Sequence, residues 1–285
     1  MKDFAVVEAL VKFMCCFVPA KRWRTRIRYR LVVNPRLQYQ LLIQGFTLND
    51  GVMTTPQGVR IDVSDTADCP LYLIREVFVK SEYNLDIGRE SVLIDIGMNR
   101  AAVSLRFACN ENIKSVYAFE PFKPTFELAK RNLELNPQLS KKINAFNFGL
   151  GKSDATLELP YMNNATGGMS TTHDVCKGAK NINKETVVIR DAAKEIAPIL
   201  EENKSKHVIV KCDCEGAEFE IFERLNEENI VGRIDVVMME YHFEKPARLV
   251  NILAENGFAV QMKAGSSKSQ TGYIYAVRMA ERICR

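Results

Sequence analysis

The chain has 285 residues, of which 47% are hydrophobic and 26% are charged, and it contains only 15 glycines and 10 prolines. This composition excludes collagen-like and intrinsically disordered proteins, and the length suits one large domain with a smaller appendage. The net charge of +4 is uneven, because residues 1–60 hold ten Lys/Arg against three Asp/Glu, net +7, which leaves net −3 for the rest.

The first predicted element is a short helix over residues 4–18, which are apolar except for Glu8 and Lys12 and are followed by Pro19. This segment is too short to span a bilayer, and its internal charges argue against a signal peptide. The cationic run KRWRTRIRYR (21–30) follows directly. Residues 1–30 therefore resemble a segment that binds the surface of an anionic membrane. A helix packed on the main domain, with a solvated basic tail, would give the same pattern, and both interpretations stay open.

Residues 31–89 are interpreted as an N-terminal extension of mixed helical and β structure. Turn signals at Asn49-Asp50-Gly51 and Pro56-Gln57-Gly58 suggest a hairpin over residues 52–63, and a helix is predicted from Leu71 to about Lys80.

From residue 90 the sequence changes to short apolar runs separated by amphipathic segments. Runs that are apolar on both faces are typical of parallel strands covered by helices on both sides. The alternation predicts one α/β domain over residues 90–285, with a doubly wound, mostly parallel sheet. Strands are expected at 91–97, 115–121, 207–216 and 233–242, helices at 122–135, 217–225 and 246–255, and a terminal hairpin at 258–279.

A carboxylate stands at the end of each central apolar run: Asp95, Glu120, Asp213 with Glu215, and Glu240 with His242 nearby. In doubly wound sheets the ligand cleft lies outside the carboxyl ends of the strands, so we expect these acids to converge on one site.

The turn after the first of these strands indicates which ligand the site takes. It has one glycine, Gly97, and lacks the G-x-G-x-x-G pattern of dinucleotide sites, which argues against an NAD-dependent oxidoreductase. An acid beside this turn repels phosphate and suits a cation, and Glu120 is placed to hold the hydroxyls of a ribose. A nucleoside with a positive charge and no phosphate is S-adenosylmethionine.

Five segments resemble, in this order, the FkbM-type S-adenosylmethionine-dependent methyltransferases: VLIDIGMNRAAVSL, SVYAFEPFKPTFELAKRNLELN, FNFGLGKSDATLEL, VIVKCDCEGAEFEIFERL and VVMMEYH. The most specific element is the K-x-D-x-E-G-x-E pattern from Lys211 to Glu218. The resemblance implies a class I, Rossmann-like methyltransferase fold with a reversed terminal strand. It also implies O-methylation, often of a sugar hydroxyl in a glycan.

The chain departs from the family's first turn, which usually has a small residue at the position of Met98 and a second glycine at that of Ala101. Arg100 also adds a positive charge near the expected sulfonium. The alternative function is therefore a membrane-associated scaffold that keeps the methyltransferase fold without the activity.

The strand ends and the resemblance together nominate the site residues. A sugar hydroxyl loses its proton as the new C–O bond forms, which requires a carboxylate or imidazole within hydrogen-bond reach. Asp213 is the first candidate base, followed by Glu215 and His242, although His242 also suits a structural histidine at a strand end. The predicted cofactor-binding residues are Asp95, Gly97, Asn99, Glu120, Pro121, Gly149 and Asp213.

The predicted partners follow from the same residues. Residues 163–172, rich in Asn, Thr, Ser and Gly, suit either an acceptor pocket for a saccharide or glycolipid or a plain surface loop. Mg²⁺ bound by Asp213, Glu215 and Glu240 is permitted by the sequence but not required. No nucleic-acid partner is expected. Eight cysteines without a CxxC pair predict free thiols in the cytoplasm, where the basic N-terminus would allow a peripheral location on the inner membrane face.

Overall fold

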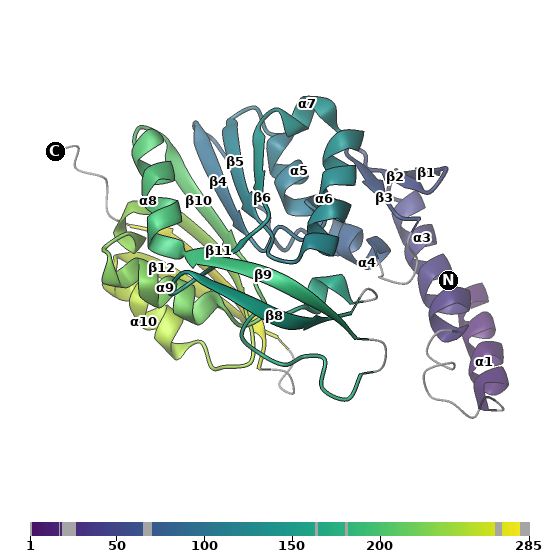
Figure 1. The fold of residues 1–285 in the computed structure, drawn as a ribbon. Coiled ribbons are helices and arrows are strands. Elements are labelled where there is room, and N and C mark those ends of the chain that lie inside the picture. The colour runs from purple at the N-terminus through teal and green to yellow at the C-terminus, as the bar shows by residue number, and fades with distance from the viewer. Residues whose placement is uncertain are drawn as a thin grey trace. The chain divides into compact units, whose positions relative to one another are not determined.

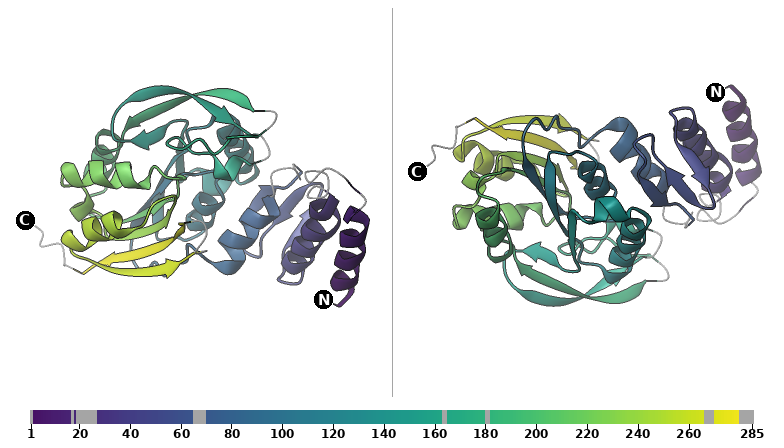
Figure 2. Two further views of the ribbon diagram at one scale, coloured as in Figure 1. Left: turned by 90° about the horizontal axis from the view of Figure 1, so that it is seen from below. Right: turned by 90° about the horizontal axis from the view of Figure 1, so that it is seen from above.

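The structure is a computed structural model that describes residues 2–16, 18, 27–64, 70–162, 165–179, 182–265 and 270–279. The chain forms two compact units, Met1–Glu82 and Tyr83–Arg285 (Figures 1 and 2). The expected boundary after residue 30 therefore falls inside the first unit. Residues 83–89, which were assigned to the extension, belong to the second unit. The reason is packing: the Tyr83 hydroxyl donates to Asp213 at 3.0 Å, and Asn112 donates to the Ile87 carbonyl at 2.6 Å.

The first unit combines helices with a small antiparallel sheet in the order β1-β2-β3. The predicted hairpin is the β2–β3 pair, to which β1 adds a third strand. The helix predicted from Leu71 continues from an α-helix into a π-helix. The elements are α1 (Lys2–Cys16), η1 (Tyr29–Val33), α3 (Asn34–Leu42), β1 (Thr47–Asn49), β2 (Val52–Thr54), β3 (Arg60–Asp62), α4 (Pro70–Ile74) and η3 (Arg75–Lys80).

The second unit is built on a seven-stranded sheet in the order β12-β13-β11-β10-β4-β5-β6. The five strands from β11 to β6 are parallel, and β13 is antiparallel to both of its neighbours, β11 and β12. This is the expected parallel sheet with a reversed terminal strand. The strands are β4 (Ser91–Ile96), β5 (Ile113–Phe119), β6 (Ile143–Phe146), β10 (His207–Cys212), β11 (Val236–Tyr241), β12 (Phe258–Ala264) and β13 (Gly272–Arg278).

Helices cover both faces of this sheet, with α5, α6 and α7 on one side and α8, α9 and α10 on the other (Figure 1). Their ends follow local sequence signals. Pro124 lies in the first turn of α6, and α10 ends before Gly257, whose φ is +82°. The helices are α5 (Ala102–Ala108), α6 (Lys123–Leu135), α7 (Pro137–Ser140), α8 (Ala192–Glu202), α9 (Glu218–Glu227) and α10 (Ala247–Glu255).

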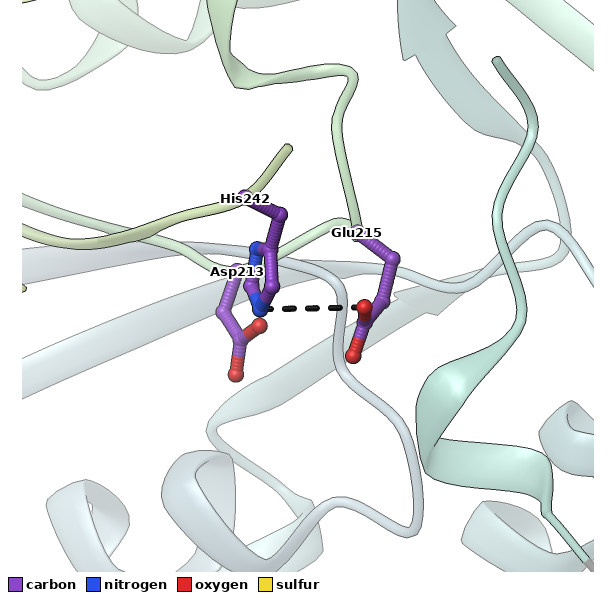
Figure 3. Close-up of side chains that lie close together, drawn as sticks. All are labelled: Asp213, Glu215 and His242. Carbon is purple, nitrogen blue, oxygen red and sulfur yellow. Dashed lines mark ion pairs between the residues drawn. The ribbon is translucent and has the colours of Figure 1, made fainter. Parts of the chain in front are cut away.

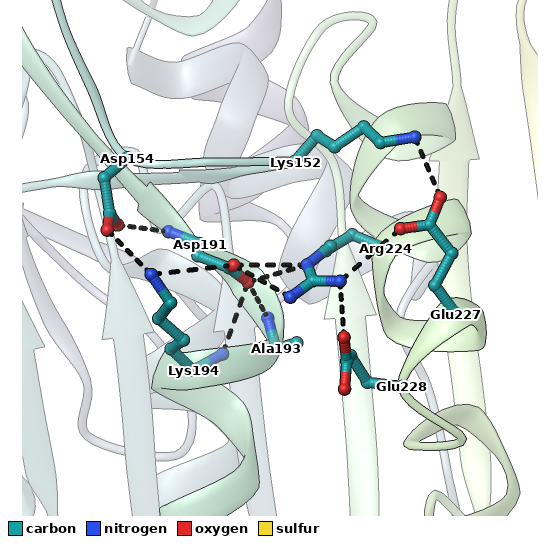
Figure 4. Close-up of polar contacts among 8 residues, drawn as sticks. All are labelled: Lys152, Asp154, Asp191, Ala193, Lys194, Arg224, Glu227 and Glu228. Carbon is teal, nitrogen blue, oxygen red and sulfur yellow. Dashed lines mark hydrogen bonds and ion pairs between the residues drawn. The ribbon is translucent and has the colours of Figure 1, made fainter.

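A second sheet, in the order β7-β9-β8, was not predicted from the sequence. It consists of β7 (Gly149–Gly151), β8 (Ala155–Tyr161) and β9 (Asn183–Asp191). Asp191 at the end of β9 caps α8 by accepting the amides of Ala193 and Lys194, and Arg224 of α9 donates to the same carboxylate (Figure 4). Asp191 thereby connects β9 of the second sheet to the helices α8 and α9.

Candidate active site

A pocket opens at the carboxyl ends of β4, β5 and β10. Of the predicted cofactor residues, Gly97, Asn99, Glu120, Pro121, Gly149 and Asp213 line it, and so does Glu215. Among the described residues, its lining includes three carboxylates, from Glu120, Asp213 and Glu215, and no Lys or Arg. The pocket therefore suits a cationic ligand rather than a phosphate. The full lining is Ile96, Gly97, Asn99, Phe119, Glu120, Pro121, Phe122, Gly149, Leu150, Thr166, Gly167, Met169, Thr171, Asp213, Cys214, Glu215 and Ala217.

The turn after β4 brings two strand ends into direct contact. A Cβ atom on Gly97, whose φ is +81°, would lie 1.8 Å from the carbonyl oxygen of Asp213, so no other residue fits here. Asn99 has a φ of +51° and points its backbone amide at Glu120 Oε2, 2.9 Å away. The side-chain oxygen of Asn99 is buried and has no hydrogen-bond partner in the part of the chain that the structure describes. A buried, unpaired acceptor in a ligand pocket indicates a missing donor.

Glu120 is only 6% exposed, and its carboxylate accepts the amides of Asn99 and Phe122. These two bonds aim the carboxylate at the pocket and leave its remaining lone pairs for a ligand. Burial raises the pKa of Glu120 to about 7, against the opposing effect of the two amides.

Asp95 is the one predicted cofactor residue that does not line the pocket. It is fully buried, and its carboxylate lies 3.2 Å from the Lys211 ammonium and accepts the Ser104 hydroxyl at 2.5 Å. Lys211 also donates to the carbonyls of Ile96 and Gly97. Burial by itself would lower the pKa of Lys211. The negative charges of Asp95 and Asp213 outweigh this effect, so the net pKa is raised and the ammonium stays charged. Asp95 thus supports the turn from behind, through Lys211.

The three predicted catalytic residues come together beside the pocket (Figure 3). Asp213, Glu215 and His242 each offer one ligand or acid–base atom, and these atoms lie within 4.8 Å of one another. His242 Nε2 is 3.7 Å from Glu215 and 3.8 Å from Glu240. Burial raises the pKa of Glu215 to about 7. Burial alone would lower the pKa of His242, but the bond to Glu218 and the charges of the nearby acids raise it to about 9.

Glu218, a residue of the K-x-D-x-E-G-x-E pattern to which no role was assigned, organises this cluster. It is fully buried, and Oε1 lies 3.0 Å from His242 Nδ1. The same carboxylate accepts the amides of Cys214 and Gly216 at 3.0 and 2.9 Å. It therefore fixes both the imidazole and the backbone turn that carries Glu215. The sequence signal that could have identified Glu218 is its position as the last residue of the K-x-D-x-E-G-x-E pattern.

Tyr83 is a second residue that the sequence analysis missed. It is 5% exposed, and its hydroxyl donates to Asp213 Oδ2 at 3.0 Å. Burial and the neighbouring Asp213 charge raise the pKa of Tyr83 well above its ordinary value, so it stays a donor. Nothing in the residues around Tyr83 signals this contact, because the two partners are 130 positions apart.

The segment predicted to be either an acceptor wall or a surface loop lies over the pocket, except that Asn163 and Asn164 fall outside the described residues. Thr166, Gly167, Met169 and Thr171 line the pocket, and the Ser170 hydroxyl donates to the Glu215 carbonyl at 2.5 Å. The ring of His173 stacks on Phe243 with centroids 4.3 Å apart. Residues 165–173 therefore form one wall of the pocket and contact the turn that carries Glu215.

Comparison with known proteins identifies the family of the chain. Residues 95–260 match the methyltransferase FkbM domain. The chain belongs to the FkbM methyltransferase family. Methyltransferase 1 of Beauveria bassiana (strain ARSEF 2860) is 26% identical over 207 residues, which are 67% of this chain and 82% of that protein. Methyltransferase sdnD of Sordaria araneosa is 25% identical over 214 residues, 66% of this chain and 82% of that protein.

Among solved structures, the methyltransferase FkbM from Methylobacillus flagellatus KT is similar with a TM-score of 0.43 and 11% identity, over 86% of this chain and 60% of that one. A putative tRNA (m1A22) methyltransferase of Streptococcus pneumoniae, in complex with S-adenosylmethionine, has a TM-score of 0.39 and 13% identity, over 69% of this chain and 71% of that one.

As a member of the FkbM family, the chain is an S-adenosylmethionine-dependent methyltransferase, and the pocket fits that cofactor. The unpaired Asn99 oxygen, the aimed Glu120 carboxylate and the excess of negative charge suit a cationic nucleoside. Arg100 is 2% exposed and does not line the pocket, so its charge does not occupy the cofactor space. Ala101 adopts the left-handed conformation, with φ +63°, at the position where the family has glycine.

Proposed function

We propose that this FkbM methyltransferase transfers a methyl group to a hydroxyl oxygen of a saccharide, either in a glycan or on a lipid carrier. The observation that carries the proposal is the cluster of Asp213, Glu215 and His242, of which Asp213 and Glu215 line the cofactor pocket. When bound, S-adenosylmethionine supplies an electrophilic methyl group. What the protein must add is orientation and removal of the hydroxyl proton.

Glu215 is better suited than Asp213 to accept this proton. Glu215 lines the pocket, and its raised pKa of about 7 lies near neutral pH, where a general base is most effective. Asp213 already accepts the Tyr83 hydroxyl at 3.0 Å, so one of its oxygens is engaged within the protein. His242 has a raised pKa of about 9 and is protonated at neutral pH, so its role is to hold Glu215 in place. Asp213 is left to orient the acceptor hydroxyl.

A saccharide is favoured because the site offers many hydrogen-bond acceptors in a small space. Asp213, Glu215 and Glu240 lie around His242, and Thr166 and Thr171 line the pocket from the covering segment. Vicinal hydroxyls satisfy several such groups at once, which a single aromatic hydroxyl does not.

The test uses S-adenosylmethionine with a labelled methyl group and saccharide extracts from cells that lack the protein. The expected product is a saccharide one methyl group heavier, with the label on oxygen as an ether. Label on nitrogen or carbon would contradict the proposal. Binding of S-adenosylmethionine without any transfer to a broad saccharide panel would favour the inactive scaffold.

Metal dependence is settled in the same assay by adding EDTA or Mg²⁺. The three atoms of Asp213, Glu215 and His242 are close enough to share an ion, but Mg²⁺ prefers oxygen ligands and an imidazole is less suited to it. The proposed mechanism routes no step through a metal, and we expect EDTA to leave turnover unchanged.

A further inference from the structure

Helix α1 carries apolar residues on two sides, which differ in their exposure among the described residues. Val11 and Cys15 are 5% and 8% exposed and pack against Val32 in a small cluster. Val6, Leu10, Phe13 and Met14 are 61%, 58%, 65% and 58% exposed. Since successive helical residues are rotated by about 100°, these four lie together on the side of α1 away from Val11 and Cys15. A contiguous exposed apolar surface of this kind indicates an interaction site.

The charge around this surface is positive. Between residues 9 and 49 the sequence has eight Lys/Arg and no Asp/Glu. Glu8, one of the two acids in the sequence of α1, is paired with Lys12 at 3.1 Å and with Arg28 at 2.8 Å. The densest part of the cationic run, residues 21–26, lies outside the described residues, but its charge follows from the sequence. The sequence from residue 9 to residue 49 therefore adds a net positive charge to the part of the chain that contains α1.

We infer that α1 binds the surface of an anionic lipid bilayer, with Val6, Leu10, Phe13 and Met14 entering the acyl boundary, and that the positive charge of the sequence that follows α1 strengthens the attraction to anionic headgroups. A second copy of the chain would cover the apolar side but would bring two cationic segments together. A nucleic acid would attract the cations but leave the apolar side in water. Among the described residues, no helix is both long enough and apolar enough to cross a bilayer, so α1 would lie along the surface.

The test is cosedimentation of the full-length protein with vesicles of phosphatidylcholine alone, or with about one third phosphatidylglycerol. We expect at least roughly tenfold more binding to the anionic vesicles at low salt, with a steep decrease as ionic strength rises. Equal or absent binding to both vesicle types at low salt would overturn the inference.

Two pairs of variants separate the contributions. Leu10→Glu with Met14→Glu should abolish vesicle binding, whereas Met262→Glu with Val277→Glu, at apolar positions of the second unit that are 54% and 47% exposed, should not. Arg22→Gln with Arg24→Gln should weaken binding roughly tenfold to thirtyfold, since each basic residue contributes to the attraction. The control for charge is Lys141→Gln with Lys204→Gln.

All four variants change exposed or cationic positions, so thermal unfolding should match the wild type within error. If the Leu10/Met14 variant binds vesicles normally but converts a dimer into a monomer in sedimentation, the apolar side joins two copies and the membrane inference is wrong. Loss of binding in both control pairs would likewise contradict it, because attraction would then not depend on α1.

Discussion

Glu120 is the residue on which cofactor affinity should depend most. A carboxylate that accepts two ribose hydroxyls makes charge-assisted hydrogen bonds, whose loss costs on the order of 1.5 to 3 kcal/mol. Glu120→Ala should therefore weaken S-adenosylmethionine roughly tenfold to a hundredfold in isothermal titration. Glu134→Ala, on the exposed side of α6, is the matched control. Unchanged affinity in a folded Glu120→Ala protein would show that the ribose lies elsewhere.

Cofactor binding should also release protons. Burial raises the pKa of both Glu120 and Glu215 to about 7, so each is partly protonated at neutral pH in the free protein. A bound sulfonium favours the ionised carboxylates, and affinity should rise from pH 6 to pH 8. Calorimetry in buffers of different ionisation enthalpy should detect this release with S-adenosylmethionine. Less release is expected with S-adenosylhomocysteine, whose sulfur is neutral.

The same raised pKa values affect stability with a definite sign. Carboxyl groups whose folded pKa exceeds the unfolded value stabilise the protein below about pH 4.5, and this contribution is lost as the pH rises through about 7. The increase in melting temperature on adding S-adenosylmethionine should accordingly be larger at pH 8 than at pH 6. An equal increase at both values would mean that neither carboxyl group changes its protonation on binding.

Glu215→Gln tests the assignment of the base. The amide keeps the shape of the side chain but accepts no proton, and general-base catalysis is typically worth 10²- to 10⁴-fold. Turnover should fall at least about 10²-fold, and the rise of kcat through pH 7 should disappear when it is measured at saturating S-adenosylmethionine, where the titration of Glu120 no longer limits binding. Asp213→Asn provides the comparison, because it should lower turnover without moving that pH dependence. If the rise disappears in Asp213→Asn instead, Asp213 is the base.

At the scale of elements, Asp191 links β9, α8 and α9. It is 4% exposed, and besides capping α8 it receives the Arg224 guanidinium at 3.0 to 3.2 Å. Asp191→Ala removes the cap, which is worth about 1 kcal/mol, and leaves Arg224 without its buried partner. We expect a loss of roughly 2 kcal/mol in denaturant unfolding, with the m-value unchanged. Asp154→Ala is the matched control, because the Asp154 side chain is 61% exposed.

The sequence predicted the central sheet well because its strands are buried on both faces and form unbroken apolar runs. The sheet of β7, β8 and β9 escaped prediction because β7 has only three residues, and because β8 and β9 are partly exposed strands with polar residues among the apolar ones, outside the apolar runs on which the prediction rested. At the site, the acids at the strand ends were predictable from topology. The hydrogen bonds from Tyr83 to Asp213 and from Glu218 to His242 were not, because periodicity says nothing about which distant side chains meet.

At the scale of the whole molecule, the cofactor site belongs entirely to the second unit. The residues that line the pocket, and the described residues that hold them by hydrogen bonds, lie between Tyr83 and Phe243. A fragment of residues 83–285 should therefore bind S-adenosylmethionine within about threefold of the full chain, a difference under 1 kcal/mol. A fragment of residues 88–285 lacks the Tyr83 bond to Asp213 and should bind more weakly. Failure of the longer fragment to bind would show that residues 1–82 are needed for the site.

The register of the central sheet also sets the order in which the protein is completed during synthesis. Strand β4 pairs on one side with β5, which follows shortly after it in the sequence, and on the other side with β10. The second pairing of residues 91–96 can form only after residues 207–212 have been synthesised. Until β10 has been synthesised, the edge of β4 that pairs with it is open. The six β4 side chains, all buried in the folded protein, are then accessible to other chains. The junction of Gly97 with Asp213 lies on that same seam. The nascent chain is thus most prone to aggregate along the line where its active site will later close.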